Sequence, residues 1–192
     1  MTDKNIREQI LLSALNHAVF DGWNDELLKK AGDECSIETH ALFPNGVFDL
    51  ICYFSDWADQ EMLKQMKEAN LKDMRIRDKI TFGVRTRLEI MAPYKQAFQD
   101  SVRYMSIPPR SFYLPKLVWK TADKIWWAAG DKSTDYNHYT KRSLLSGVIT
   151  ATTLFWFNDK SENNERTWDF LDKRIENVLK IGQFIGKAKR KA

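Results

Sequence analysis

Cysteine, proline and glycine are scarce in this chain of 192 residues, which contains two, five and eight of them, respectively. The two cysteines, Cys35 and Cys52, cannot make a disulfide framework and do not have the spacing of a metal site. The longest uncharged run, residues 144–157, is too short to span a bilayer as a helix. The first residues resemble neither a signal peptide nor a transit peptide. These absences predict a protein of a reducing, cytoplasmic compartment.

Sequence signatures of catalysis are missing as well. The chain has no phosphate-binding loop, no dinucleotide glycine motif, no nucleophile elbow and no paired Glu-x-x-His motif for a di-iron site. Its three histidines, His17, His40 and His138, fall in different predicted elements. A metal or acid–base site built from Asp131, Asp135 and His138 has no matching residues elsewhere. We therefore predict no catalytic residue, no metal site and no enzymatic activity.

The formal net charge of +4 comes from one end of the chain. Residues 187–192 carry four of the 30 basic side chains and no acid, so 26 basic and 26 acidic side chains remain and cancel. The charge balance therefore gives no sign of a nucleic-acid-binding face. The basic end suits an anionic membrane surface or an acidic partner, and a solvated chain end is the alternative.

Apolar residues recur at helical spacing along nearly all of the chain, and strand-like alternation is absent. This pattern predicts an all-α fold. Near the N-terminus we expect a first long helix and then two short ones. The first short helix covers 25–31, with Asn24 as its cap and Gly32 after its end, and the second covers 36–43, with Ser36 as its cap.

A second long helix is expected to start near Val47. A long helix, two short helices and another long helix form the layout of a TetR-type helix-turn-helix unit. The third helix of such a unit enters the major groove of DNA. Here the stretch before and through that helix, 32–42, contains Asp33, Glu34 and Glu38 and no Lys or Arg. Acids facing phosphates repel them. We therefore predict the shape of this unit without its DNA-binding function, and we keep a TetR-type ligand-responsive transcriptional regulator as the alternative.

The rest of the chain predicts further helices. Residues 64–94 form a charged amphipathic helical stretch that Pro93 kinks or ends, and residues 107–115 form a proline-rich loop. The next helix ends at Gly130. Residues 144–157 are apolar nearly all round, which predicts the central helix of the domain. The last helix is expected to begin near Asn164.

The densest polar chemistry lies in residues 126–147, between two apolar segments. Asp131 suits the glycine turn, and Asp135 suits the first turn of the next helix, where the helix dipole favours an anion. These roles do not explain why His138 and Tyr139 occur at this junction. Tyr, His and Arg are typical of a protein–protein contact, so we predict that this junction binds a partner.

Several stretches make the chain recognisable. "AAGDKSTDYNHYTKRSLLSGVITATTLF" and "TWDFLDKRIENVLKIG" strongly resemble the coenzyme Q biosynthesis protein nine (Coq-nine) family. "AVFDGWNDELLKKAG", "LFPNG" and "RTRLEIMAPY" look like the N-terminal half of that family. The stretch "GDKSTDYNHYTKR" carries most of the specificity.

The resemblance implies an all-helical, TetR-like helical bundle that binds lipid and not nucleic acid. It implies an accessory protein of ubiquinone biosynthesis that binds an isoprenoid lipid or quinone precursor and presents it to the di-iron demethoxyubiquinone hydroxylase. No cofactor is expected besides that lipid. We expect one domain, with a helix-turn-helix-like three-helix subdomain over 1–60 and a lipid-pocket helical region over 61–192.

The resemblance also bears on assembly and location. A homodimer and a peripheral contact with the membrane surface are expected. The location would be the cytoplasmic side of a bacterial inner membrane, or the mitochondrial matrix side for a mature eukaryotic chain.

Two sets of site residues follow. Carried onto this sequence, the surface that contacts the hydroxylase comprises Asp135, His138, Tyr139 and Arg142. The candidates for lipid contact lie on the helices expected to face the C-terminal core, and plain core packing is the alternative for each of them. They are Trp119, Trp126, Leu145, Ile149 and Phe155.

Overall fold

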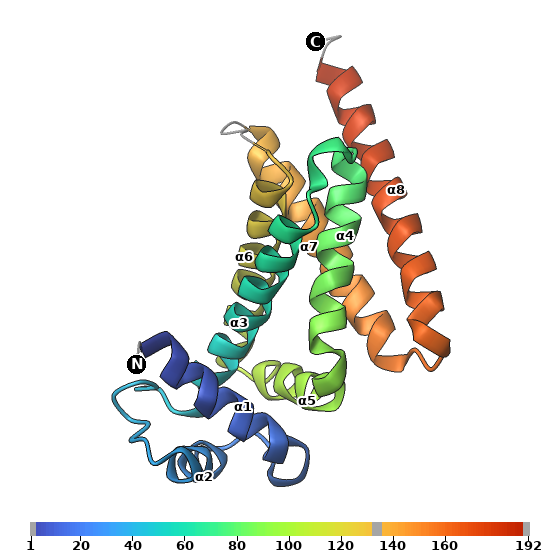
Figure 1. Cartoon of the computed structure of the whole chain (residues 1–192). Coiled ribbons are helices and arrows are strands. Elements are labelled where there is room, and N and C mark those ends of the chain that lie inside the picture. Colours follow the sequence, from blue (N-terminus) through green and yellow to red (C-terminus); the bar gives the residue numbers. More distant parts are fainter. Residues whose placement is uncertain (1–2, 132–135, 190–192) are drawn as a thin grey trace. The chain divides into compact units, whose positions relative to one another are not determined.

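The computed structural model describes residues 3–131 and 136–189 of the chain (Figure 1). Every regular element in these ranges is helical, which confirms the predicted all-α class. The α-helices are α1 (Asp3–Asp21), α2 (Asp25–Cys35), α3 (Val47–Glu68), α4 (Ile76–Met91), α5 (Lys95–Met105), α6 (Leu114–Ala128), α7 (Tyr136–Asn158) and α8 (Glu165–Lys189). Short 3-10 turns are η1 (Leu71–Asp73), η2 (Ala92–Tyr94), η3 (Arg110–Tyr113) and η4 (Glu162–Asn164).

The chain divides into two compact units that alternate along the sequence. Unit 1 comprises Met1–Glu61 and Ile90–Leu117, and unit 2 comprises Met62–Glu89 and Val118–Ala192. Residues 90–117, which the sequence analysis grouped with the C-terminal region, thus lie in the same unit as the N-terminal helices.

Unit 1 is built around a cluster of aromatic rings. The Trp23 ring stacks on Phe54 at a centroid distance of 6.1 Å, and its indole Nε1 donates a hydrogen bond of 2.9 Å to the Ala97 carbonyl. Edge-on contacts from Tyr94 and Phe98 reach the same Phe54 ring at 6.4 and 6.0 Å. These contacts tie the α1–α2 connection to α3 and α5, because large rings bury much apolar area and prefer stacked or edge-on packing.

Helix α2 begins as the sequence predicts but ends differently. The Asn24 side-chain oxygen accepts a hydrogen bond of 2.8 Å from the Leu27 amide, which confirms the cap. The helix then runs through Gly32 to Cys35, and Ser36 adopts a left-handed conformation with φ 56°. The Ile37 amide donates to the Gly32 carbonyl at 2.9 Å and closes the helix end.

The predicted short helix over 36–43 does not form. Residues 37–39 have no regular structure, and turns lead from there to Val47, where α3 begins as expected. One cause is the close return of the chain over Gly32, where a Cβ atom would lie 2.8 Å from the Ile37 carbonyl oxygen. Pro44 is another cause, since it disfavours the helical conformation of the residue before it. The prediction of a helix-turn-helix unit is therefore wrong for its third helix.

The amphipathic stretch over 64–94 is two helices and not one. Asn70 takes a left-handed conformation with φ 44° between α3 and η1, and α4 starts only at Ile76. The predicted end near Pro93 is confirmed, since α4 stops at Met91 and Pro93 lies in η2. Gly130 has φ 94° and follows the end of α6, also as predicted.

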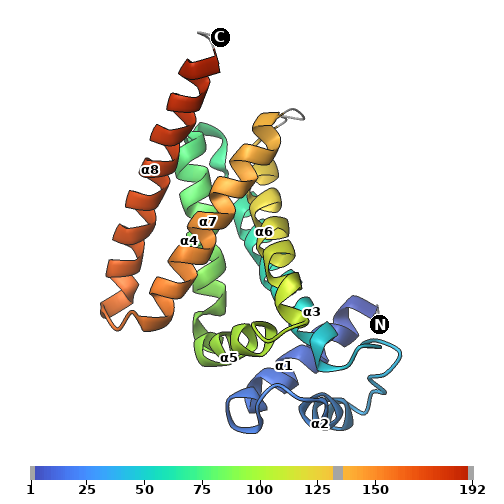
Figure 2. The same cartoon turned by 180° about the vertical axis from the view of Figure 1, so that it is seen from behind.

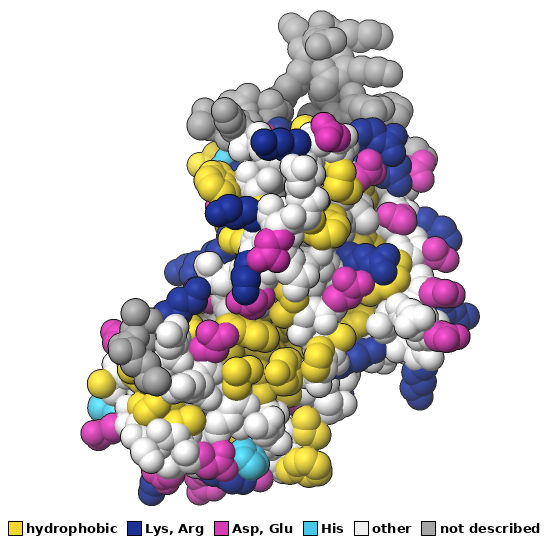
Figure 3. Space-filling view, viewed as in Figure 1, with side chains coloured by type: hydrophobic (Ala, Val, Ile, Leu, Met, Phe, Trp, Pro, Cys, Tyr) yellow, Lys and Arg dark blue, Asp and Glu magenta, His cyan; other side chains and the backbone are white. Residues whose placement is uncertain are grey.

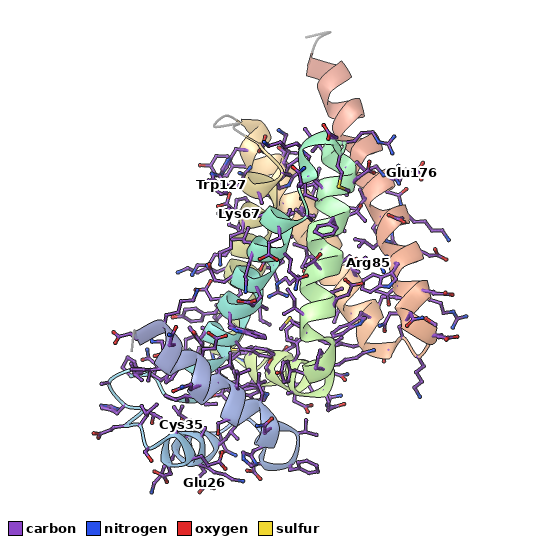
Figure 4. The ribbon with its side chains drawn as sticks, viewed as in Figure 1. Glu26, Cys35, Lys67, Arg85, Trp127 and Glu176 are labelled. Carbon is purple, nitrogen blue, oxygen red and sulfur yellow. The ribbon has the colours of Figure 1, made fainter. Side chains whose placement is uncertain are left out.

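In unit 2, α7 and α8 run antiparallel as a helical hairpin (Figures 1 and 2). The side chains of Leu145, Val148, Ile149 and Trp156 are buried along α7. Leu154 is 54% exposed, however, so the apolar residues that surround α7 over 144–157 are not buried on every side of the helix. Arg85 on α4 lies next to α8 (Figure 4), where its guanidinium is 4.8 Å from the centre of the Trp168 ring.

The surface of α8 in Figure 3 carries basic and acidic side chains interspersed. Among the described residues, no helix combines the length and the apolar character that a membrane crossing requires.

Candidate functional site

The junction between α6 and α7 is held by a buried arginine. Arg142 on α7 is 2% exposed. Its Nε donates to the Asp123 carboxylate at 2.5 Å, and its Nη1 donates to the Asp131 carboxylate at 3.0 Å. The second Asp131 oxygen accepts a 2.7 Å bond from the ammonium of Lys141. The corner therefore consists of two cations and two carboxylates that clamp the end of α6 to the start of α7.

Arg142 was predicted to belong to the partner-binding surface, and the burial of its side chain corrects this prediction. Its side chain fixes the corner from inside and offers no exposed atoms to a partner. Its partner Asp123 was missed. The available signal was that Asp123 is the one acid of α6, on a helix that otherwise carries only apolar, polar and basic residues. Asp135, the fourth predicted contact residue, lies outside the described residues.

An aromatic cluster lies on the surface next to this clamp. It comprises Trp119 of α6 and the adjacent residues His138 and Tyr139 of α7. The Tyr139 ring is 6.3 Å from the Trp119 ring and 5.2 Å from the His138 ring. Tyr139 is 62% exposed. Trp119, which the sequence analysis placed among the lipid-contact residues, thus supports an exposed ring.

Another exposed ring of α6 is Trp127, which is 73% exposed and points outward from the helix (Figure 4). Its neighbour Trp126 points inward, and the Trp126 Nε1 donates a 3.1 Å hydrogen bond to the carbonyl of Lys141. The Lys141 ammonium lies 5.4 Å from the centre of the same ring. One residue of α7 therefore contacts both Asp131 in the clamp and Trp126 in the core.

Trp126 and Leu145, two of the predicted lipid-contact residues, meet at a small cavity in unit 2. The cavity has a volume of about 30 Å³. Its wall comes from four helices and comprises Ile76, Arg77, Ile80, Trp126, Leu145, Ile175 and Val178. Pockets for drug-sized ligands have volumes of about 300–1,000 Å³. The cavity is lined mainly by apolar side chains, and a prenylated molecule does not fit into it without movement of its wall.

The other predicted lipid-contact residues lie elsewhere. Ile149 is buried further along α7. Phe155 stacks on Phe170 of α8, with a centroid distance of 4.5 Å and an interplanar angle of 10°. The five predicted residues thus do not line one pocket. Within the described ranges, no three side chains of the His, Cys, Asp or Glu types are grouped as a metal would require.

The hydroxyl groups of α7 differ in their partners. The Thr150 hydroxyl donates to the Ser146 carbonyl at 2.9 Å, as threonines in helices often do. Thr152 is fully buried, and its hydroxyl oxygen has no hydrogen-bond partner among the described residues. Helical periodicity alone does not tell which of these hydroxyl groups finds an acceptor.

A solved structure shares the fold of this chain. A solved TetR transcriptional regulator from Nitrosomonas europaea superposes with a TM-score of 0.74 and 20% identity, over 91% of this chain and 98% of that chain. The chain thus has the predicted TetR-like all-α fold.

The sequence comparisons are more specific. The COQ9 family model matches residues 113–182, which include the cavity-lining parts of α6, α7 and α8 and the aromatic cluster. The ubiquinone biosynthesis protein COQ9 of Drosophila melanogaster is 26% identical, over 94% of this chain and 57% of the relative. The COQ9 protein of Bos taurus is 30% identical, over 94% of this chain and 60% of the relative. The chain thus spans about three fifths of these relatives, and the predicted resemblance to the COQ9 family is confirmed.

Proposed function

We propose that this protein is a non-catalytic accessory protein of ubiquinone biosynthesis. The names of the COQ9 relatives support the pathway. One structural observation carries the mechanism, namely that α6 and α7 form both the exposed aromatic cluster and part of the cavity wall. Tyr139 lies on the surface and Leu145 lines the cavity, six residues further along the same helix. A partner docked on the cluster would therefore sit next to the route of a ligand leaving the cavity.

The ligand in this proposal is an isoprenoid lipid or a prenylated quinone precursor. The apolar wall of the cavity favours such a chain over any charged ligand. Because a cavity of about 30 Å³ is too small for such a chain, binding requires a wider state in which part of the wall moves outward. Ile76, at the start of α4, is the one wall residue that is also a strongly exposed apolar side chain in the described ranges. We place the entrance at this residue.

The partner in this proposal is the di-iron hydroxylase of demethoxyubiquinone, docked on Tyr139 and His138. Exposed Tyr beside Trp and His is typical of interface anchors, which cost about 2 kcal/mol or more in binding free energy when truncated. The clamp of Arg142 keeps this surface fixed, so docking costs little ordering of the backbone. A homodimer and a peripheral membrane contact remain predictions. A mitochondrial location, which the names of the relatives give for those proteins, also remains a prediction for this chain.

The experiment that tests docking is capture of the purified hydroxylase by the full chain and its variants. Tyr139→Ala and His138→Ala should reduce capture by about 30-fold or more for at least one of the two, which is the fold-change of about 2 kcal/mol. Leu154→Ala is the matched control, since Leu154 is an exposed apolar residue on α7, about 22 Å further along the helix. Melting temperatures should stay within a few degrees of the wild-type value, because the replaced Tyr139 ring is mostly exposed. Normal capture by both variants contradicts the proposed surface.

The experiment that tests the ligand is mass spectrometry of lipids extracted from the purified protein. We expect an isoprenoid lipid that is displaced by an added ubiquinone precursor. Ile76→Trp places a large ring at the proposed entrance and should reduce this exchange, whereas Met74→Trp, at an exposed position outside the cavity wall, should not. A protein without lipid that also binds no precursor would remove the basis of the proposal.

The absence of DNA binding is also part of the proposal. The connection between α2 and α3 carries Glu38, has no Lys or Arg from Gly32 to Gly46, and is not helical. Specific binding to DNA depends on cations at the phosphates and on an element that enters the groove. The similarity to a TetR regulator, at 20% identity, extends to the fold.

A further inference from the structure

The connection between α5 and α6 exposes large apolar side chains. Ile107 is 56% exposed, Phe112 is 79% exposed, and Tyr113 is about half exposed. These three residues, which we call the connection patch, lie in unit 1, whereas the cavity and the aromatic cluster belong to unit 2. The connection between α5 and α6 can be followed in Figure 2. Contiguous exposed apolar side chains mark surfaces that contact a partner or a membrane.

The patch is held in a fixed shape. The Arg110 amide donates to the Ile107 carbonyl at 3.0 Å, and the Phe112 amide donates to the Pro109 carbonyl at 3.3 Å. The Tyr113 ring meets the Phe48 ring of α3 edge-on at 4.9 Å. Because these contacts order the turn before any partner arrives, the exposed rings do not lose much conformational freedom on binding.

The charges around the patch have one sign. From Ser101 to Leu117 the chain contains no acid and three cations, Arg103, Arg110 and Lys116. Arg103 is neutralised by Asp100 at 2.7 Å. Arg110 lies 3.8 Å from the centre of the Tyr104 ring, and its Nε has no hydrogen-bond partner among the described residues. Arg110 and Lys116 therefore remain as cations beside the patch.

The nearest acid on α3 does not cancel this charge. Asp49 follows Phe48, and its carboxylate accepts hydrogen bonds from the amide and the side chain of Asn45 at 2.8 to 3.2 Å. It therefore faces the turn before α3 and not the patch. The connection patch is apolar and aromatic and has cations beside it. These properties complement a surface that is anionic outside and apolar inside.

We propose that the connection patch inserts into the headgroup region of a bilayer that contains anionic phospholipids. Tyr and Phe rings are favoured at the membrane interface, and each nearby cation adds about 1 kcal/mol of attraction to an anionic leaflet. This contact is separate from lipid carriage in the cavity and from docking of the hydroxylase. It goes beyond the proposed function, since it assigns a membrane-facing side to unit 1.

The test is co-sedimentation of the full chain with phosphatidylcholine vesicles that do or do not contain phosphatidylglycerol. The wild-type protein should bind the anionic vesicles, and binding should weaken at high salt because the charges are exposed. The double variant Ile107→Ser/Phe112→Ser should lose about tenfold or more of this partitioning, because two large apolar side chains no longer leave water. Lys116→Gln should lose about fivefold, the equivalent of one cation.

Phe20→Ser is the matched control. Phe20 is 89% exposed in the same unit, but Asp21 follows it and Asp25 and Glu26 lie nearby in the sequence. This variant should bind vesicles as the wild-type protein does. The basic residues 187–192 are present in every variant, so their contribution cancels in the comparison.

Two results overturn the proposal. One is undiminished vesicle binding by the Ile107→Ser/Phe112→Ser variant, which would assign the patch to a protein partner or to no partner. The other is an equal loss with Phe20→Ser, which would make the effect unspecific. Melting curves verify that each variant is folded. Mass spectrometry of the co-purified lipid should give the same result for wild type and variants, so failure here is distinct from failure of the proposed function.

Discussion

Asp159, in the turn between α7 and α8, is the residue whose charge should matter most for the stability of this hairpin. Its carboxylate accepts hydrogen bonds from the Thr167 hydroxyl at 2.6 Å and from the Thr167 amide at 2.9 Å. It also accepts from the Ser161 hydroxyl at 2.7 Å and from the Ser161 amide at 2.9 Å. Burial alone raises the pKa of this carboxyl, but these bonds outweigh burial and lower the pKa from 3.8 to about 2.

This lowered pKa has a direct consequence for stability. The folded-state pKa lies below the unfolded one, so the stabilisation is fully present above pH 3.8 and is lost as the pH falls through 2. A difference of nearly two pKa units corresponds to about 2 kcal/mol at pH 7 and to roughly half of that at pH 3. Replacement of the carboxylate removes the whole contribution.

The variant that tests this reasoning is Asp159→Asn, which keeps the shape but has one acceptor atom in place of two. Urea unfolding should show a loss of about 2 kcal/mol at pH 7 relative to the wild-type protein. The difference between the two proteins should shrink to about 1 kcal/mol at pH 3. Asp169→Asn, at an exposed position on α8, is the control and should change stability by less than about 0.5 kcal/mol. A difference that is the same at pH 7 and pH 3 would show that the charge of Asp159 does not stabilise the fold.

Two further variants test the corner and the cavity. Arg142→Met should lower the free energy of unfolding in urea by about 3 kcal/mol, since it leaves the buried Asp131 with one cation. Lys141→Met should lower it by about 1 kcal/mol, because Lys141 is partly exposed. Equal losses would mean that burial of the arginine is irrelevant. In the same measurement, Leu145→Ala should lower the free energy of unfolding by about 2–5 kcal/mol, because it enlarges the cavity. The control Leu154→Ala should lower it by less than about 0.5 kcal/mol. A small loss for Leu145→Ala would mean that the cavity wall collapses easily.

Most helices of this protein follow from local sequence signals. Asn24 caps α2, Pro93 falls just after α4, and Gly130 follows α6, because each of these residues acts through its own backbone or its immediate neighbours. The short helix expected over 36–43 fails for a reason that is not local. Its residues return over Gly32, and that close approach depends on packing between segments that helical periodicity does not describe.

The candidate site shows the same division. The sequence indicates an interaction surface near His138 and Tyr139, since neither the turn nor the start of the helix requires amphipathic residues at these positions. It does not distinguish them from Arg142, because all three are polar or amphipathic and lie within five positions. The structure separates them, because the Arg142 guanidinium is buried and bonded to the carboxylates of Asp131 and of Asp123, nineteen residues away. An acid on the neighbouring helix thus helps to decide which side chain of such a cluster is buried and which one faces a partner. The sequence signal for this acid is a single acidic residue on an otherwise apolar, polar and basic helix.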